Sequence, residues 1–279
     1  MICLRRENKS MRKNIFELMR GNKIDLFEEY YRLYRLFQKT RFEDESSIMS
    51  FIQNYYFLQW EHRKRYISIR DLLTSLELTD DEMDREDITN EKLLLYCEII
   101  YNLINLMENN TLSNIGLQNI KVLENNVLDL LEDMNYEIKR NTKKQFVIIE
   151  KDNLSTAIAE KFPDIADKVI EYRRFILKGN IKAKKEILLE LSNKIEPLRN
   201  KFKNTSYKDI IEDINMLLNN LNIRHNNIEG KHRKEHTAKM SNEELEKWYD
   251  KTYDMILGAF ILEDYIDSKL DLDLLKSQF

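Results

Sequence analysis

The side chains best suited to chemistry gather in one short segment of this chain. His225, His232 and His236, three of the four histidines, lie within twelve residues, and Arg224 directly precedes them. Residues 224–236 carry four Lys or Arg against two Glu, although the whole chain has a net charge of −4. Imidazole exchanges protons near neutral pH, and a guanidinium matches phosphate oxygens. The segment could therefore bind an anionic group and act on it.

An apolar stripe at helical spacing precedes Arg224 and predicts a core helix over 207–221. Its members are Tyr207, Ile210, Ile211, Ile214, Leu217, Leu218 and Leu221. Arg224 takes the next position of that face, where a charged guanidinium needs an anion, an opening or the last helix carbonyls. Capping of the helix end is the purely structural alternative. Ser241 and Glu244 form a predicted capping box for the next helix, so the link spans roughly 15 residues, a length typical of functional loops.

The run Arg224-His225-Asn226-Asn227, followed by His232 between two helices, resembles the HEPN superfamily of all-helical RNA-cleaving proteins. The pattern of that superfamily is an Arg at the end of a core helix, four to six residues and a His, with a polar residue beside the Arg. The resemblance covers about residues 205–266. It implies a toxin or phage-defence effector of the abortive-infection kind, which works as a homodimer, needs no metal or cofactor, and has an antitoxin or regulatory protein as a possible partner.

The same resemblance assigns roles to these residues in metal-independent endoribonuclease chemistry. Arg224 would bind the scissile phosphate and stabilise the charge that develops on it. His232 or His225 would serve as the acid or base that activates a ribose 2′-hydroxyl. Asn226 or Asn227 would orient the phosphate or a ribose oxygen.

Two other functions stay open. A binding or sensor module derived from a HEPN domain, without catalysis, is favoured by the seven residues between Arg224 and His232 and by the absence of an obvious basic groove. A metal-dependent hydrolase would use His232 and His236, four residues apart, with Glu229 or Glu235. Without a fixed third ligand, solvated histidines are expected there and no metal site.

Composition predicts the scaffold that must position this segment. Among 279 residues there are only 5 Gly and 2 Pro, too few for Gly-rich phosphate loops or for the corners of sandwiches and barrels. We therefore predict an all-α bundle of long amphipathic helices with one small β-hairpin near 136–150, formed by 136–139 and 145–149. Helices are also predicted around the stripe at 27–37 and over 48–78, and Pro197 is expected to end or kink a helix.

The acidic run 79–87 interrupts the apolar periodicity and predicts a boundary. Residues 1–85 would form an N-terminal helical layer or subdomain, and residues 88–279 the main domain. Cys97 lies on a predicted core face, so a structural thiol is expected. The two cysteines suit a reducing cytosol, and no apolar run approaches the ~18 residues of a membrane span. We therefore expect a cytoplasmic protein with no membrane contact, and the HEPN resemblance implies RNA as its partner.

Overall fold

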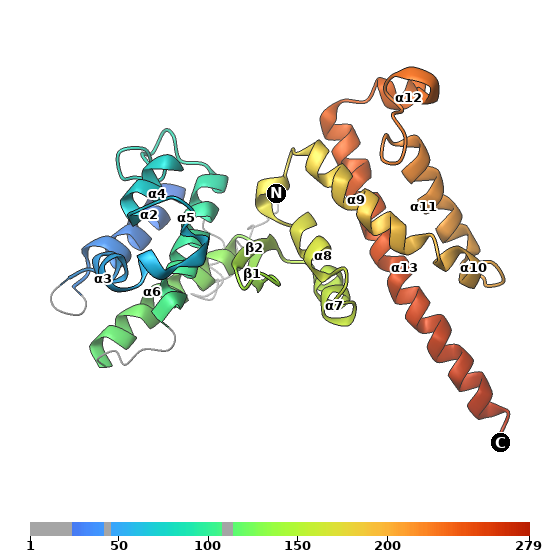
Figure 1. Cartoon of the computed structure of the whole chain (residues 1–279), viewed down its shortest axis with the longest axis horizontal. Coiled ribbons are helices and arrows are strands. Elements are labelled where there is room, and N and C mark those ends of the chain that lie inside the picture. The colour runs from blue at the N-terminus through green and yellow to red at the C-terminus, as the bar shows by residue number, and fades with distance from the viewer. Residues whose placement is uncertain (1–23, 42–45, 108–113) are drawn as a thin grey trace, which may run out of the picture. The chain divides into compact units, whose positions relative to one another are not determined.

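The computed structural model describes residues 24–41, 46–107 and 114–279, and the fold there is all-α with one two-stranded hairpin, as predicted. The chain divides into two compact units, Met1–Met134 and Asn135–Phe279 (Figure 1). The predicted boundary at residues 85–88 lies inside the first unit, where Leu78 and Met83 beside it are fully buried. Residues 1–23 of the predicted N-terminal layer lie outside the described residues. None of the described helices combines the length and apolar character needed to cross a bilayer.

The first unit begins with a helix that Asp25 caps by accepting the backbone N–H groups of Phe27 and Glu28. Of the stripe predicted at 27–37, Tyr30, Tyr34 and Phe37 are buried, whereas Tyr31 is 45 % exposed. The helices of this unit are α2 (Leu26–Tyr34), the π-helix η1 (Arg35–Lys39), α3 (Ile48–Tyr55), η3 (Phe57–Gln59), η4 (Glu61–Arg63), α4 (Ile69–Ser75), α5 (Asn90–Ile104), η5 (Asn105–Met107) and α6 (Asn114–Asp133).

The helical stretch predicted over 48–78 is divided into four short helices. The third of them ends just before Lys64, which takes a left-handed φ of 55° that no α-helix continues through. Ser68 then caps a new helix by accepting the N–H of Asp71. Leu58, expected on the apolar face, is 60 % exposed.

The second unit opens with the predicted hairpin, β1 (Tyr136–Arg140) and β2 (Phe146–Glu150), which pair antiparallel with Ile138 opposite Ile148. The helices that follow are α7 (Asn153–Lys161), α8 (Ala166–Tyr172), η6 (Phe175–Leu177), α9 (Ile181–Ile195), α10 (Leu198–Phe202), α11 (Lys208–Asn220), η7 (Gly230–His232), α12 (Glu235–Ala238) and α13 (Asn242–Lys276). Pro197 separates α9 from α10, as predicted. The capping box of Ser241 and Glu244 is confirmed at the start of α13.

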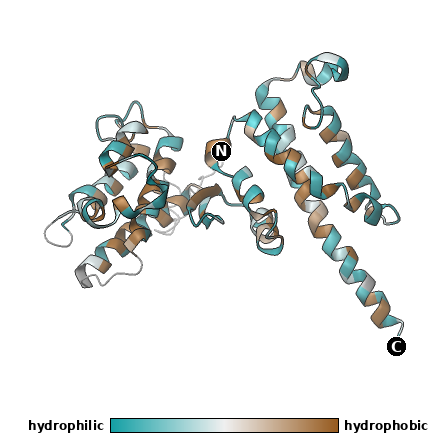
Figure 2. Cartoon of the chain, in the orientation of Figure 1, coloured by the Kyte–Doolittle hydropathy of each residue, from teal (hydrophilic) through white to brown (hydrophobic). Residues whose placement is uncertain are grey.

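The core of the second unit lies between α9, α11 and α13, with α7 and α8 packed on the same cluster. Ile211, Ile214 and Leu218 confirm the predicted stripe on α11, because each is buried against this cluster. Tyr249 and Tyr253 bury the facing side of α13. Apolar residues continue along α13 toward its C-terminal end (Figure 2). The segment after α11 therefore begins at the end of a helix that is packed in the core of its unit.

Candidate functional site

The predicted site segment forms a loop between α11 and α13 whose start is tied to the core. α11 ends at Asn220, and the chain turns there because Asn222 adopts a left-handed φ of 60°. Ile223 is buried, and the backbone N–H of Arg224 donates to the Leu218 carbonyl at 2.9 Å. Arg224 thus lies past the end of the helix, held against its last turn. We call residues 222–236 the histidine loop.

The Arg224 guanidinium has partners within the chain. One terminal nitrogen donates to the Asn215 side-chain oxygen at 2.9 Å, and the other contacts the Glu196 carboxylate at 3.0 Å. The Arg224 side chain is only 20 % exposed, whereas that of Glu196 is 56 % exposed. The anion that a half-buried guanidinium needs is therefore supplied by the end of α9. An incoming phosphate would have to compete with a carboxylate that is already largely in water.

The structure brings two of the predicted site residues together. The imidazole rings of His225 and His232 stack, with centroids 5.0 Å apart and planes inclined by 26°. One lies near the start of the histidine loop and the other in η7, and both are exposed. His225 directly follows Arg224, so a guanidinium and two proton-exchanging rings belong to the same loop. Such a set can bind a phosphate and move protons at the oxygens around it.

Asn227 holds the histidine loop together from within. It is 1 % exposed, and its side-chain oxygen accepts the Asn222 N–H at 2.7 Å while its amide nitrogen donates to the His232 carbonyl at 2.9 Å. Its own carbonyl accepts the Lys234 N–H at 2.7 Å. Both ends of the Asn227 amide are engaged with backbone groups, so this residue positions His232.

Asn226 and His236 play different parts. The Asn226 side-chain oxygen accepts the N–H groups of Ile228 and Glu229, which forms a local turn on the surface. His236 lies in the short α12, apart from the stacked pair. In the part of the chain that the structure describes, no group of three His, Cys, Asp or Glu side chains is arranged to hold a metal ion.

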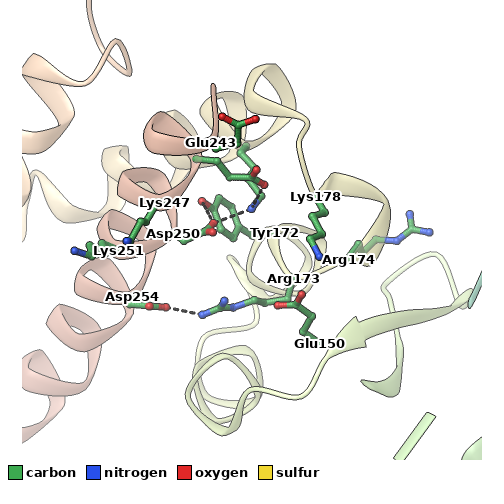
Figure 3. A pocket seen from close by; sticks show the side chains of 12 residues that line it. Glu150, Tyr172, Arg173, Arg174, Lys178, Glu243, Lys247, Asp250, Lys251 and Asp254 are labelled. Atoms are coloured by element: carbon green, nitrogen blue, oxygen red, sulfur yellow. Dashed lines mark hydrogen bonds and ion pairs between the residues drawn. The ribbon is translucent and has the colours of Figure 1, made fainter. Parts of the chain in front are cut away.

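A second site, which the sequence analysis missed, is a cleft of about 400 Å³ in the second unit (Figure 3). Eleven of its twelve lining residues are charged, six of them basic and five acidic. Four of the five carboxylates come from α13, which also carries two of the cations, Lys247 and Lys251. Three of the remaining cations lie between α8 and α9, and the fourth, Lys184, lies in α9.

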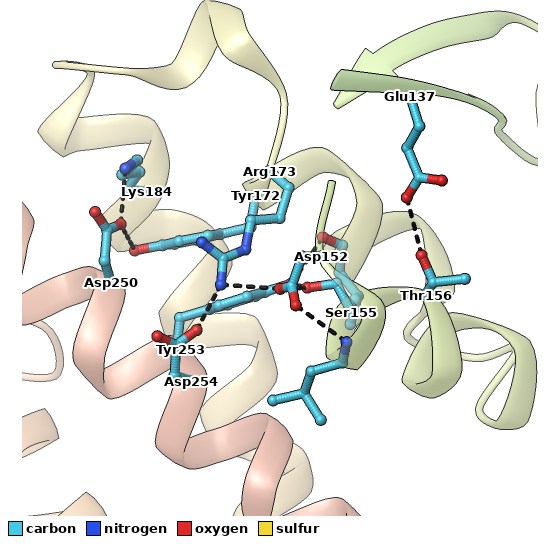
Figure 4. A network of polar contacts seen from close by, with 12 residues as sticks. Glu137, Asp152, Ser155, Thr156, Tyr172, Arg173, Lys184, Asp250, Tyr253 and Asp254 are labelled. Carbon is cyan, nitrogen blue, oxygen red and sulfur yellow. Dashed lines mark hydrogen bonds and ion pairs between the residues drawn. The ribbon is translucent and has the colours of Figure 1, made fainter. Parts of the chain in front are cut away.

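Arg173 is the centre of the polar network beside this cleft (Figure 4). Its guanidinium contacts the carboxylates of Asp152 at 2.9 Å and Asp254 at 2.5 Å, and it lies over the Tyr253 ring. Burial alone would raise the pKa of Asp152, but the Ser155 hydroxyl and Arg173 more than offset it and hold that pKa below its ordinary value. Burial raises the pKa of Asp254.

Lys184 forms the other half of the network. Its side chain is 9 % exposed, and its ammonium contacts Glu246 at 2.8 Å and Asp250 at 2.7 Å. Asp250 also accepts the Tyr172 hydroxyl at 3.0 Å, and Tyr172 stacks on Tyr253 with centroids 4.0 Å apart. Lys184 and Arg173 therefore each have two carboxylate partners, as buried charges require. These pairs join α7, α8 and α9 to α13.

The sequence did contain a signal for this network. Glu246, Asp250 and Asp254 follow one another at intervals of four, which places three like charges on one face of a helix. Such a row is unfavourable unless cations cover it. The partners Arg173 and Lys184 could not be identified from sequence, because 81 residues separate Arg173 from Asp254 and 66 separate Lys184 from Asp250.

Comparison with known proteins finds no relative. No model of a known family, no curated protein and no solved structure matches the chain. The chain's own side-chain geometry must therefore support any functional proposal.

Proposed function

We propose that this chain is a metal-independent endoribonuclease of the HEPN type whose active site is the histidine loop. The observation that carries the proposal is the stacked pair of His225 and His232, in which His225 directly follows Arg224 in the sequence. The resemblance to toxins and phage-defence effectors extends the proposal to a protein that acts on RNA in the cytoplasm as a homodimer, with an antitoxin or regulatory protein as its further partner.

The chemistry needs two proton transfers and one charged group on the phosphate. One imidazole of the pair removes the proton from a ribose 2′-hydroxyl, and the 2′-oxygen attacks the adjacent phosphorus. The bond from phosphorus to the 5′-oxygen breaks, and the other imidazole gives that oxygen a proton. Arg224 exchanges Glu196 for the phosphate and stabilises the added negative charge. The products are a 2′,3′-cyclic phosphate and a 5′-hydroxyl.

Asn226 and Asn227 have different roles in this proposal. The Asn227 amide is occupied by backbone groups of the loop, which supports a positioning role through the His232 carbonyl. Asn226 is left to orient the substrate, because its side chain is exposed and it directly follows His225 in the sequence.

A non-catalytic RNA-binding module is the second candidate. Arg224 already has Glu196 and Asn215 as partners, so its contact with a phosphate must replace an existing contact. Binding alone would use the exposed cations of the loop, Lys231 and Lys234, without any proton transfer. Cleavage and binding are therefore measured on the same samples.

The test is RNA cleavage by the purified full chain in excess EDTA. We expect His232→Ala and His225→Ala each to lower the cleavage rate by about 100-fold or more, because general acid–base groups contribute that much. His236→Ala is the matched control, since His236 belongs to the same loop but lies outside the stacked pair. Circular dichroism shows whether all variants keep the helical content of the parent.

The outcomes separate the two candidates. The nuclease is supported if the parent and the His236→Ala variant produce cyclic phosphate ends and the His225→Ala and His232→Ala variants do not. RNA binding without cleavage, weakened by Arg224→Ala, would support the binding module instead. Equal cleavage by the parent and the double variant His225→Ala/His232→Ala would exclude the histidine loop as the active site.

A further inference from the structure

The C-terminal part of α13 extends beyond the core of its unit. Ile266 is the last residue of the chain that belongs to the buried cluster, and among residues 267–279 every side chain that the structure describes is exposed. Figure 1 shows this part of α13 running on past α10 to the C-terminus. A helical stretch of roughly ten residues is marginal in water when nothing packs against it. This stretch contacts the rest of the unit at its start, where Asp267 forms an ion pair with Lys201 of α10 at 2.6 Å, and its described side chains add nothing to the buried cluster that stabilises the rest of α13.

An apolar stripe runs along the same part of the helix. Its apolar members are Ile261, Tyr265, Leu272 and Leu275, and the polar Ser268 takes the position between Tyr265 and Leu272, so that the intervals alternate between four and three residues. Phe279 takes the next position of the repeat but lies beyond Lys276, where α13 ends. At 3.6 residues per turn they fall within an arc of about 80°. The exposed fractions are 46 % for Leu272, 49 % for Leu275 and 101 % for Phe279. This average spacing of 3.5 residues is that of a coiled-coil seam.

The charges beside the stripe are arranged by sign. Asp264 and Asp271 lie along one edge, and Lys269 and Lys276 lie along the other. In coiled-coil terms the acids take g positions and the lysines e positions. Two parallel copies would place Asp271 of each beside Lys276 of the other, whereas antiparallel copies would set acid against acid and lysine against lysine. The edge charges therefore favour parallel self-pairing.

The pair of charges nearer the core, Asp264 and Lys269, already has one contact within the chain. Asp264 forms an ion pair with Lys161 of α7. The outer pair, Asp271 and Lys276, is thus the one that should decide orientation. Lys276 has a contact of 3.8 Å with Asp273 of its own helix, and both its side chain and that of Asp273 are more than half exposed.

We propose that residues 261–276 form a parallel two-stranded coiled coil with the same residues of a second copy of this chain. The exposed stripe supplies the seam, and the edge charges set the orientation. This proposal rests on α13 alone and does not depend on the proposed nuclease activity. Because the seam covers about two heptads, fewer than the three to four that sustain a stable coiled coil, we expect weak pairing that depends on concentration.

The first experiment measures the mass of the full chain by sedimentation equilibrium from about 5 to 200 µM. The parent should move from 33.8 kDa toward twice that mass as its concentration rises. Leu275→Glu should raise the dissociation constant at least tenfold. Leu274→Glu is the matched control, because Leu274 is 65 % exposed but points away from the stripe. Since both residues lie beyond the core, both variants should keep the thermal midpoint of the parent.

The second experiment tests orientation. Lys276→Asp should weaken pairing about threefold, and adding Asp271→Lys to it should restore the parent's dissociation constant, because the exchanged charges again face opposite signs. In a Cys3→Ser background, Leu275→Cys should form a disulfide-linked dimer on mild oxidation, and Leu274→Cys should not. Parallel pairing brings two copies of position 275 together, whereas antiparallel pairing separates them.

Each result bears on the proposal in one direction. A monomer at every concentration would overturn it, and so would equal effects of Leu275→Glu and Leu274→Glu. Cross-linking through position 274 but not 275 would also overturn it. His232→Ala should leave the dissociation constant unchanged, which keeps the outcome separate from that of the nuclease assay.

Discussion

At the scale of single residues, Arg173 shows how a buried charge is held in this chain. It lies between Asp152 and Asp254 and is 17 % exposed. The Ser155 hydroxyl donates to Asp152, so this carboxylate has two stabilising partners when it is ionised. A group whose pKa is lower in the folded state than in the unfolded state adds stability above its unfolded pKa. Asp152 therefore stabilises the second unit at neutral pH.

The first prediction concerns acid stability. The contribution of Asp152 should be fully present above about pH 5 and should be lost as the pH falls through its lowered folded-state pKa, because the unfolded carboxylate binds a proton first, near pH 3.9. Asp254, whose pKa is raised, acts in the opposite direction. Asp152→Asn should cost about 1–3 kcal/mol at pH 7 and flatten the acid side of the stability curve.

Urea unfolding followed by circular dichroism between pH 3 and pH 7 measures this effect. Asp87→Asn is the control, since it removes an exposed carboxylate of the first unit and should leave the slope of the curve unchanged. If Asp152→Asn and the parent lose stability in parallel on acidification, Asp152 does not carry the effect.

Asn227 and Arg224 show which features of single residues could be predicted from the sequence and which could not. The spacing of Arg224, in register with the predicted apolar stripe over 207–221, indicated a charge in need of a partner. Glu196 could not be identified as that partner, because 28 residues and a different helix separate the two. Asn226 and Asn227 were predicted as alternatives for orienting the substrate, and Asn227 is the buried one, because a run of adjacent Asn residues does not reveal which amide turns inward.

At the scale of elements, the sequence predicted those helices, strands and caps that depend on residues close together in the chain. The stripe over 207–221, the hairpin and the capping box at Ser241 each follow from residues close together in sequence. The stretch 48–78 could not be predicted in this way. The break between its third and fourth helices lies at Lys64, whose left-handed backbone no residue pattern signals, and the Gln53 side chain accepts the Ile69 N–H at the start of the fourth helix at 2.7 Å.

The second prediction compares two glycines of the second unit. Gly258 lies inside α13, where an added Cβ would meet no atom within 4 Å, so Gly258→Ala should raise the free energy of unfolding by about 0.5–1 kcal/mol. Gly179 has a φ of +76°, and its N–H donates to Glu246 at 2.8 Å. Gly179→Ala should therefore lower the free energy of unfolding by about 1 kcal/mol through backbone strain.

Thermal and urea unfolding of the two variants measure the change in the free energy of unfolding, which should be positive for Gly258→Ala and negative for Gly179→Ala. Gly179→Asn serves as a further control, because Asn tolerates the left-handed conformation better than Ala and should cost less. Destabilisation by Gly258→Ala would show that α13 is packed more closely at this point than the open space around Gly258 implies.

At the scale of the whole molecule, each compact unit contains its own core. The buried cluster of the second unit is drawn entirely from residues between 158 and 266. In the first unit, α2 and α5 meet through the rings of Tyr30 and Tyr96, whose centroids are 4.9 Å apart. A unit with its own core can fold independently.

The third prediction follows from this division. Residues 135–279, expressed alone, should give a helical circular dichroism spectrum and unfold in one cooperative transition. A shorter fragment, 181–279, lacks Arg173 and Asp152 and leaves the acidic row of α13 without one of its cations, so it should be markedly less stable. If the longer fragment shows no cooperative transition, the two units depend on each other for folding.

α13 has 35 residues, so it is about 52 Å long. The histidine loop leads into its N-terminal end, and the exposed stripe occupies its C-terminal end. Two copies joined in parallel at the stripe would hold both histidine loops at corresponding ends of the pair. A single RNA strand could then meet two loops in succession, and the second contact would form at high effective concentration, which can raise avidity by about 10²–10⁴ over one loop.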